Sequence, residues 1–362
     1  MRLTVLSVAW PFAPVGPDPV GGAEQILSDL DRALVSQGHV SLVAACEGSR
    51  PAGRLFAAPL PPAGTLDEAT LRSTHVRFQA AIDRALASRK VQVIHMHGFD
   101  FHEYSLPPDI PVLVTLHLPT NWYPKDIWER YEGRVLFQFV SEAQRRSGPP
   151  ALRDSPVVPN GVRLPAVWRA RKDDFALALG RVCPEKNVHE ALEAGTAAGV
   201  RVLLGGRVFP FAQHLKYFAE RVQPLLKPKP GGPAHEFLGP LAFARRRRLL
   251  TRAKCLLHPT LAPETSSLVA MEAMAAGTPV IAYPSGALPE IVEDGKTGFL
   301  VNNVDEMVNA MGRIHTIRPE VCRSTAERRF SGERMTRAYF RLYRMLTAPG
   351  AKPLANEDRL YG

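Results

Sequence analysis

The chain has 362 residues, of which 45% are hydrophobic and 22% are charged. This length suffices for two domains of ordinary size, and the composition is that of a globular protein. No stretch approaches the roughly 18 to 20 apolar residues of a membrane-spanning helix. The four cysteines, Cys46, Cys183, Cys255 and Cys322, are scattered without a C-x2-C pair. This spacing argues against a metal site or a disulfide framework and favours a reducing cytoplasm.

The formal net charge of +10 raises the question of a nucleic-acid or anionic membrane partner. The one true cluster is Arg245-Arg-Arg-Arg248. Four consecutive residues of a helix point around most of its circumference rather than along one face. A solvated surface therefore explains the cluster better than a binding patch, and we expect no nucleic-acid partner.

The N-terminal segment predicts a β-α-β unit. Residues 3–9 and 40–45 are apolar strands, and residues 23–37 carry apolar side chains at helical spacing with Gly38 past the end. Such a unit implies a parallel sheet. Gly21-Gly22 stands at the strand-to-helix turn, where a backbone without side chains can approach a ligand and the helix start attracts phosphate.

The rest of the first half predicts a helix over 66–88 and three further strands, at 91–95, 112–116 and 135–140. His97 and His117 follow two of these strands, at the carboxyl edge where open α/β sheets place ligands. The histidines of this half could suggest a metal, but they lack ligand spacing, and strand-end histidines are commonly hydrogen-bonded structural residues. Four of them cluster in the sequence, namely His95, His97, His102 and His117.

A second β-α-β alternation begins with the strand Phe175–Leu179, and a strand over 201–206 ends in glycines. Arg181 and Lys186 lie five residues apart in the strand-to-helix loop, so both cations can close on one diphosphate. Ordinary surface charge is the weaker explanation, because cations at a helix start oppose the helix dipole.

Residues 259–282 place two carboxylates around a helix start. A buried strand, 255–258, leads into a proline-bounded loop, and Thr265 or Ser266 is expected to cap the helix that follows. Glu264 then lies at the helix mouth and Glu272 about two turns in. A helix start suits a phosphate and a carboxylate suits sugar hydroxyls, although a structural unit with one capping and one surface glutamate fits the periodicity equally well.

The run P-x3-P-E-x7-E-A-M-A-x-G-x-P-V-I-A over these residues resembles the signature of the retaining, nucleotide-sugar-dependent glycosyltransferases of GT-B fold, family 4. The family usually has small-aromatic-Gly or Pro after the first glutamate, whereas this chain has Thr265-Ser-Ser267. That departure concerns the detailed sugar and phosphate contacts. The resemblance covers nearly the whole chain and includes V-x-x-N-G-V at 157–162, G-R-x4-K-G/N at 180–187, F-L-G-x-L at 237–241 and the glycine-rich run at 286–300.

For the fold, the resemblance implies an α/β protein with two Rossmann-like domains, each a doubly wound parallel sheet, facing across a cleft that holds the donor. The acceptor-binding domain would cover 1–165 and the donor domain 166–330. A helix over 331–346 would cross back to the first domain, and 347–362 would be a tail.

For the site, the resemblance implies that Glu264 contacts the transferred sugar and Glu272 binds the ribose hydroxyls. His117 would face the sugar as the second catalytic residue. Gly21 and Gly22 would reach the donor phosphates or the acceptor. The remaining donor contacts would come from cations, from N–H groups at the helix start and from apolar residues lining the base pocket, namely Arg181, Lys186, Ser267, Leu268, Leu238 and Leu241.

The expected reaction transfers a sugar from a UDP- or GDP-linked donor to a hydroxyl of a glycan, lipid or small molecule, with retention and with neither metal nor other cofactor. No obvious nucleophile is present, so the working hypothesis is front-face attack assisted by the donor phosphate. A lipid acceptor would add peripheral membrane contact to a cytoplasmic location. Two alternatives stay open: a nucleotide-sugar epimerase of the same fold, and a non-catalytic homologue that binds a sugar nucleotide or nucleic acid. The sequence names neither donor, acceptor nor oligomeric state.

Overall fold

The computed structural model describes residues 2–19, 21–61, 67–228 and 230–348. The chain divides into two compact units, of which unit 1 comprises Met1–Asn160 with Met335–Gly362 and unit 2 comprises Gly161–Arg334. The division thus falls within the turn at 157–162, against the expected 165, and the C-terminal helix is divided between the units after Arg334. The expected tail lies outside the described residues from 349 onward.

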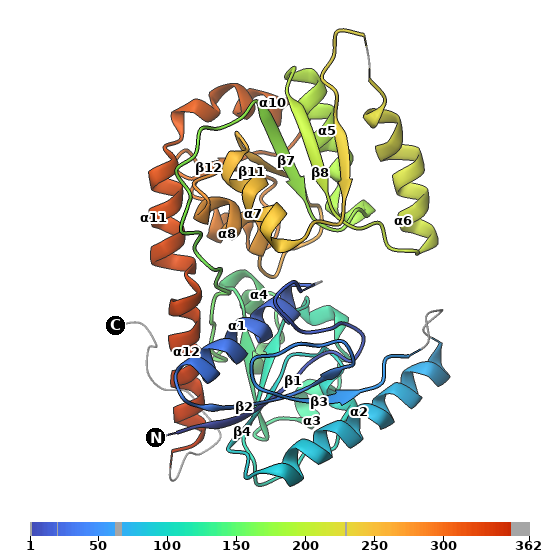
Figure 1. Cartoon of the computed structure of the whole chain (residues 1–362), viewed down its shortest axis with the longest axis vertical. Helices are drawn as coiled ribbons and strands as arrows, with labels where there is room; N and C mark the ends of the chain where they lie inside the picture. Colours follow the sequence, from blue (N-terminus) through green and yellow to red (C-terminus); the bar gives the residue numbers. More distant parts are fainter. Residues whose placement is uncertain (1, 20, 62–66, 229, 349–362) are drawn as a thin grey trace. The chain divides into compact units, whose positions relative to one another are not determined.

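Unit 1 is built on six parallel strands in the order β3-β2-β1-β4-β5-β6 (Figure 1). Their bounds are β1 Thr4–Val8, β2 Val40–Cys46, β3 Arg54–Ala58, β4 Val93–Met96, β5 Val112–Leu116 and β6 Val135–Phe139. The order runs outward from β1 in one direction and from β4 in the other, which is the doubly wound arrangement expected. Strand β3, an edge strand, was absent from the sequence prediction.

Both faces of this sheet are covered, as the period of two in β2 shows. Leu42 belongs to the same apolar cluster as Phe78 of helix α2 (Glu68–Ser88). Val43 belongs instead to the cluster of Leu27 from α1 (Gly22–Ser36). Successive residues of one strand therefore face different helices, which explains its uninterrupted apolar sequence. Helix α2 begins at Glu68, capped by Asp67, later than predicted.

A polar network fixes the C-terminal helix α12 (Gly332–Leu346) to unit 1. The hydroxyl of Tyr343 lies 2.7 Å from Nδ1 of His95 on β4. Tyr339 donates to Oε1 of Gln138 on β6 at 2.8 Å. Thr115 on β5 joins the two, 2.8 Å from both His95 Nε2 and Gln138 Oε1. All five side chains are buried, so each hydrogen bond removes a desolvation penalty that an unpaired group would incur.

Unit 2 repeats the architecture with a six-stranded parallel sheet in the order β12-β11-β10-β7-β8-β9. Its strands are β7 Phe175–Leu179, β8 Arg201–Gly205, β9 Glu236–Gly239, β10 Leu256–His258, β11 Val280–Ala282 and β12 Gly298–Leu300. The order reverses between the neighbours β7 and β10. Such a switch point is where open α/β sheets bind ligands, beyond the carboxyl ends of the strands.

Helices cover this sheet as the crossover rule requires. Helix α5 (Val188–Ala197) packs on β7 and β8 and contacts α10 (Val304–Arg313). Helix α8 (Leu268–Ala275) packs on β10 and β11 and contacts α11 (Pro319–Phe330) (Figure 1). The remaining helices are α3 Ile127–Arg130, α4 Glu142–Arg146, α6 Ala212–Tyr217, α7 Phe243–Arg252 and α9 Leu288–Ile291. Among the described residues, no helix is long and apolar enough to cross a membrane.

The α12 network predicts that its hydroxyl groups stabilise unit 1. Tyr343→Phe and Tyr339→Phe should each lower the free energy of unfolding by about 1–3 kcal/mol, because a buried partner loses its hydrogen bond. Urea denaturation of the full chain measures the loss. Tyr131→Phe is the matched control, since its half-buried hydroxyl makes only a 3.4 Å contact with the carbonyl of His102. Equal stability of all three variants would show that the network contributes nothing.

Candidate functional site

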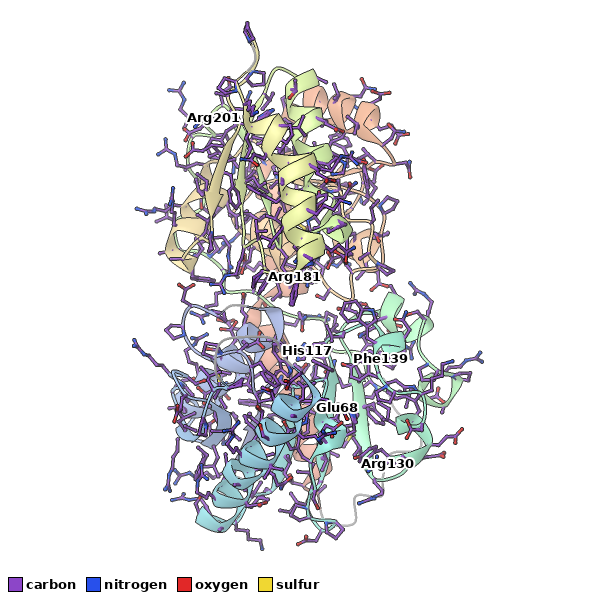
Figure 2. All side chains as sticks on the ribbon, turned by 90° about the vertical axis from the view of Figure 1, so that its right-hand side faces the viewer. Glu68, His117, Arg130, Phe139, Arg181 and Arg201 are labelled. Carbon is purple, nitrogen blue, oxygen red and sulfur yellow. The ribbon has the colours of Figure 1, made fainter. Side chains whose placement is uncertain are left out.

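The loops that follow β7 and β10 meet at the switch point of the unit 2 sheet. Figure 2 shows Arg181, which follows β7, at one end of unit 2 and Arg201, the first residue of β8, at the other. The carboxyl ends of the strands therefore lie at the end that carries Arg181. Arg181 is exposed, so its guanidinium group is open to solvent.

The loop after β7 is held to the loop after β10 by backbone hydrogen bonds. The carbonyl of Glu185 accepts from the N–H groups of Leu261, at 2.9 Å, and Ala262, at 3.3 Å. After the short 3-10 turn Pro184–Lys186, Asn187 adopts the left-handed conformation with φ of 52°. Asparagine tolerates that region better than most residues. The G/N position of the sequence motif is therefore the residue that turns the chain into α5.

Glu264 lies beside two basic side chains from the neighbouring strands. It forms an ion pair with Nζ of Lys186, and its Oε1 lies 3.3 Å from Nε2 of His258. Only 11% of the Glu264 side chain is exposed. Burial alone would raise the pKa of Glu264, but the hydrogen bond with His258 and the charge of Lys186 outweigh it and lower the pKa to about 2. Glu264 is therefore an anion at any physiological pH, able to accept hydrogen bonds but not to donate a proton.

The loop after β11 fixes the backbone of Glu264. The N–H of Ala287 donates to the carbonyl of Glu264 at 2.8 Å. Gly286, with φ of 59°, lies so close that a Cβ there would stand 2.4 Å from the nitrogen of Glu264. A side chain at this position would both strain the backbone and displace the glutamate. The glycine of the G-x-x-x-E run therefore has a positioning role that spacing alone did not reveal.

The start of α8 differs from the sequence prediction. Ser267, and neither Thr265 nor Ser266, is the N-cap, and its Oγ accepts from the N–H of Ala270 at 3.4 Å. The Oγ also lies 3.3 Å from Nε2 of His258. Leu268 is the first helical residue. The contact of Ser267 with the buried His258 at the strand end accompanies a cap that falls one residue after Ser266 and two after Thr265.

Glu272 is the fifth residue of α8, closer to its start than the predicted two turns. It is buried and paired with Arg246 of α7, with Nη2 to Oε1 and Nε to Oε2 both at 3.1 Å. Arg246 also lies over the ring of Phe243, 5.1 Å from its centroid. One member of the arginine cluster thus has a defined partner, which the solvated-surface interpretation missed, while Arg245 and Arg248 are exposed as expected.

Leu238 and Leu241, the predicted base-pocket residues, are both half-buried at the β8–β9 side of this edge. Leu241 packs over the end of β8: a Cβ on Gly205 would stand 2.4 Å from its Cδ1 and 2.8 Å from Cδ2 of Leu179. The glycine that ends β8 therefore makes room for Leu241. This contact holds the side chain of Leu241 at the carboxyl edge of the sheet.

In unit 1, the buried His97 and the half-buried His117 form a pair beyond β4 and β5. Nδ1 of His97 lies 3.1 Å from Nε2 of His117, and the rings stack with centroids 5.4 Å apart. Burial lowers the pKa of His117 to about 4 and holds the pKa values of His95 and His97 well below the ordinary value. All three rings are therefore neutral at pH 7. His95 is a structural residue of the α12 network.

At the start of α1, the backbone N–H group of Gly21 already has a hydrogen-bond partner within the chain. Gly21 is the N-cap and Gly22 the first helical residue. The buried carboxylate of Glu24 accepts hydrogen bonds from the N–H groups of Gly21 and of Glu24 itself. A Cβ on Gly21 would stand 2.4 Å from Glu24 Oε2. The helix start where the sequence predicts phosphate is therefore already occupied by the carboxyl group of Glu24, whose pKa burial raises.

Sequence reasoning missed two site residues, His258 and Arg246. His258 was assigned to a buried strand, although it ends β10 at the switch point, and that position was the available signal. Arg246 follows Phe243 by three residues, so both occupy one face of α7, and only the tertiary contact with Glu272 singles it out. In unit 2 the structure brings together Glu264, Lys186, Ser267 and His258.

Comparisons with known proteins show which families the two halves of the chain match. Residues 20–164 match the model of the Glycosyltransferase Family 4, and residues 175–316 match that of the Glycosyl transferases group 1. The two models together span most of the chain. A phosphatidyl-myo-inositol mannosyltransferase of Mycobacterium leprae is 26% identical over 94% of this chain and 97% of its own length.

Two solved structures share the fold of the whole chain. AviGT4, a glycosyltransferase involved in avilamycin A biosynthesis, is 25% identical and aligns with a TM-score of 0.70 over 96% of this chain and 98% of its own. Anabaena Alr3699/HepE in complex with UDP-glucose is 18% identical, with a TM-score of 0.70 over 94% of this chain and 99% of its own.

The neutral histidines predict that unit 1 loses stability before its carboxylates titrate. With a native pKa of about 4, His117 binds a proton only in the unfolded chain between pH 6.5 and 4. Stability contributed by the neutral ring is therefore complete above pH 6.5 and falls on acidification, by up to about 1.4 kcal/mol per pH unit for each such histidine. Urea denaturation at pH 7, 6 and 5 in a Trp168→Phe background, which leaves tryptophans only in unit 1, measures this slope.

His117→Asn should reduce the slope of the free energy of unfolding against pH by the contribution of one histidine, up to about 1.4 kcal/mol per pH unit. His315→Asn, at an exposed position, should leave this slope unchanged. Identical slopes for wild type and His117→Asn would contradict the burial of a neutral imidazole.

Proposed function

We propose that this chain, which belongs to the GT-B glycosyltransferases, transfers a sugar from a nucleoside diphosphate sugar to an acceptor hydroxyl with retention of anomeric configuration. The family models confirm the resemblance on which the sequence analysis relied. The donor type, the retention and the residue roles are the proposal. The observation that carries it is the meeting of Lys186, Glu264 and the start of α8 at the switch point of unit 2.

The diphosphate is the group that Arg181 and Lys186 suit best. Arg181 offers a planar fork from an exposed position, and Lys186 offers a point charge. The N–H groups at Ser267 and Leu268 add donors and the partial positive charge of the helix start. Together these groups stabilise the negative charge that develops on the leaving diphosphate, the task that divalent metals perform in other enzymes.

Glu264 suits the sugar. Because its pKa is about 2, the carboxylate stays ionised and accepts hydrogen bonds from sugar hydroxyls. An anion at this position also stabilises the positive charge that the sugar acquires as the bond to the diphosphate breaks. A carboxylate locked in its ionised form is not a general acid, so we assign the leaving-group stabilisation to the cations instead.

Glu272 accepts the ribose hydroxyls in this proposal, with Arg246 holding the carboxylate in place. Leu238 and Leu241 receive the base. His117, a neutral ring in unit 1, accepts a hydrogen bond from the transferred sugar. Gly21 and Gly22 retain their proposed role through their backbone, although Glu24 already satisfies the N–H of Gly21.

The relatives support the donor and acceptor classes. HepE has been solved with UDP-glucose, and the mycobacterial relative is named for phosphatidyl-myo-inositol as acceptor. We therefore extend to this chain a UDP- or GDP-linked donor and a glycan, lipid or small-molecule acceptor. We extend retention to this chain from its resemblance to the retaining glycosyltransferases of family 4, and we propose front-face attack assisted by the donor phosphate as the mechanism.

The diphosphate contacts give the first functional prediction. Arg181→Ala and Lys186→Ala should each weaken binding of free UDP or GDP roughly tenfold or more, because a charge-assisted hydrogen bond to phosphate contributes about 1.5–3 kcal/mol. Isothermal titration calorimetry measures the affinity. Arg201→Ala, at the opposite edge of the same sheet, is the matched control and should bind normally. Unchanged affinity in the Arg181 and Lys186 variants would remove both residues from the site.

The two glutamates should affect different kinetic constants. Glu272→Gln should raise the donor KM and the Kd of free diphosphate together, because it removes a contact to the ribose. Glu264→Gln should leave the diphosphate Kd nearly intact and lower kcat about a hundredfold or more, since a preorganised electrostatic contact contributes roughly 2.7–4 kcal/mol. Steady-state kinetics with calorimetry separates the two. If both variants lose only thermal stability, the glutamates are structural.

The reaction should not need a divalent metal, since cationic side chains fill that role. The Asp29-x-Asp31 run lies within α1, and Asp31 is already bonded to Ser41 at 2.7 Å and to the N–H of Gly53 at 3.0 Å. Activity should therefore survive dialysis against EDTA, measured as donor turnover before and after adding back Mg²⁺ or Mn²⁺. Loss of turnover with EDTA and recovery with either metal would contradict the proposed mechanism.

A further inference from the structure

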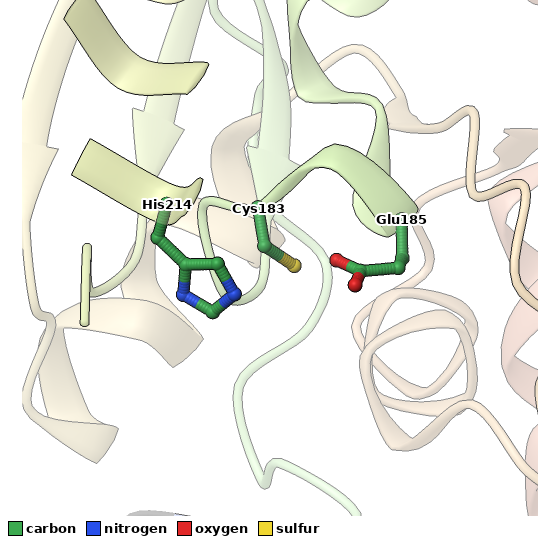
Figure 3. A group of neighbouring side chains, drawn as sticks. All are labelled: Cys183, Glu185 and His214. Atoms are coloured by element: carbon green, nitrogen blue, oxygen red, sulfur yellow. The ribbon is translucent and has the colours of Figure 1, made fainter. Parts of the chain in front are cut away.

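Three side chains of unit 2 with metal-binding chemistry meet outside the set assigned to the donor. They are Cys183 and Glu185, either side of Pro184, and His214 of α6. Their ligand atoms all lie within 4.8 Å of one another. Figure 3 shows the thiol of Cys183 between the imidazole of His214 and the carboxylate of Glu185. Cys183 and His214 lie 31 positions apart in the sequence, so sequence spacing gave no sign of the group.

The imidazole of His214 is buried and presents one of its ring nitrogens to the other two side chains (Figure 3). The residue is 7% exposed, and its Nδ1 is buried without a hydrogen-bond partner among the described residues. Figure 3 shows the ring turned toward Cys183. Phe211 packs edge-on against the ring, with centroids 5.2 Å apart, and Phe209 lies at 6.4 Å. The nitrogen nearer Cys183 is Nε2, so Nε2 is the atom that would bind a metal, while Nδ1 lies on the far side of the ring (Figure 3).

The donor set selects the kind of metal. A thiolate and an imidazole favour Zn²⁺, whereas Mg²⁺ and Mn²⁺ prefer oxygen ligands. Ligands of a tetrahedral zinc lie about 3.3–3.8 Å apart, so closure from the present separations needs shifts of about 1 Å. Glu185 is exposed and can make that shift by side-chain rotation. Three protein ligands leave a fourth position for water.

We propose that Cys183, Glu185 and His214 bind Zn²⁺ as a site separate from the sugar-transfer chemistry. On binding, the S–H bond of Cys183 breaks, a sulfur–zinc bond forms, and the proton passes to solvent. No electron is transferred, so the step needs no oxidant or reductant. The proposal rests on these three residues and holds whether or not the chain transfers sugar.

The ion would tie the loop after β7 to α6. Cys183 and Glu185 belong to the same loop as Arg181 and Lys186, and α6 follows β8. A cross-link between them would reduce the motion of residues 180–187. Amide hydrogen exchange should therefore slow in this loop when Zn²⁺ is present, a readout that does not depend on donor turnover.

Cobalt substitution tests the site directly. The metal-free full chain, titrated with Co²⁺, should bind one equivalent and show a thiolate-to-cobalt charge-transfer absorption band, which reports sulfur coordination. Cys183→Ser should abolish the band. Calorimetry with Zn²⁺ should show at least about tenfold weaker binding in His214→Gln and Glu185→Gln, since even outer-shell changes cost 10- to 100-fold. Mg²⁺ should not bind at the same site.

Matched controls keep the test decisive. Cys46→Ser changes another buried cysteine and His315→Gln an exposed histidine, and both should bind as wild type does. Near-ultraviolet circular dichroism checks that each variant is folded. If a variant at a buried position does not fold, Glu185→Gln, at an exposed position, still tests the site. The proposal is overturned if wild type binds no Co²⁺, if the band persists in Cys183→Ser, or if folded Glu185→Gln binds Zn²⁺ with wild-type affinity.

Discussion

A buried ion pair between Lys186 and Glu264 is the interaction on which the unit 2 site depends. Both side chains are largely removed from solvent, at 19% and 11% exposure, and each offsets part of the desolvation cost of the other, while His258 adds a second contact to Glu264. Breaking a buried pair by removing one partner costs about 3–5 kcal/mol, more than most single surface changes. The pair therefore fixes the loop after β7 against the loop after β10 before any donor arrives, and it holds a carboxylate in its charged form.

The surroundings of this pair follow from the topology. The strand order reverses between β7 and β10, so the loops that carry Lys186 and Glu264 both leave the sheet at the switch point. His258 ends β10 and reaches both Glu264 and the cap of α8. Gly286 allows the next loop to close over the backbone of Glu264. The fixed backbones and paired charges of these loops hold the polar groups of the site in place before a ligand binds.

Sequence patterns predicted the elements well and their partners poorly. Periodicity and turn residues located the two parallel sheets, and the motifs located Glu264, Lys186 and Ser267 in one region. They could not show that Glu272 pairs with Arg246, that Glu24 fills the helix start at Gly21, or that His214 meets Cys183. Each of these contacts joins residues whose proximity depends on how helices pack rather than on local spacing. The same limit explains why the cap of α8 was placed one or two residues too early.

The stereochemistry of donor hydrolysis tests the central proposal most directly. A high concentration of the chain is incubated with α-linked UDP- and GDP-sugars, with water as the only acceptor, and the products are followed by proton NMR before mutarotation. The proposal predicts release of the nucleoside diphosphate together with the α-anomer of the free sugar. Appearance of the β-anomer first would contradict retention. Conversion of the intact nucleotide sugar into an epimer would contradict glycosyl transfer itself.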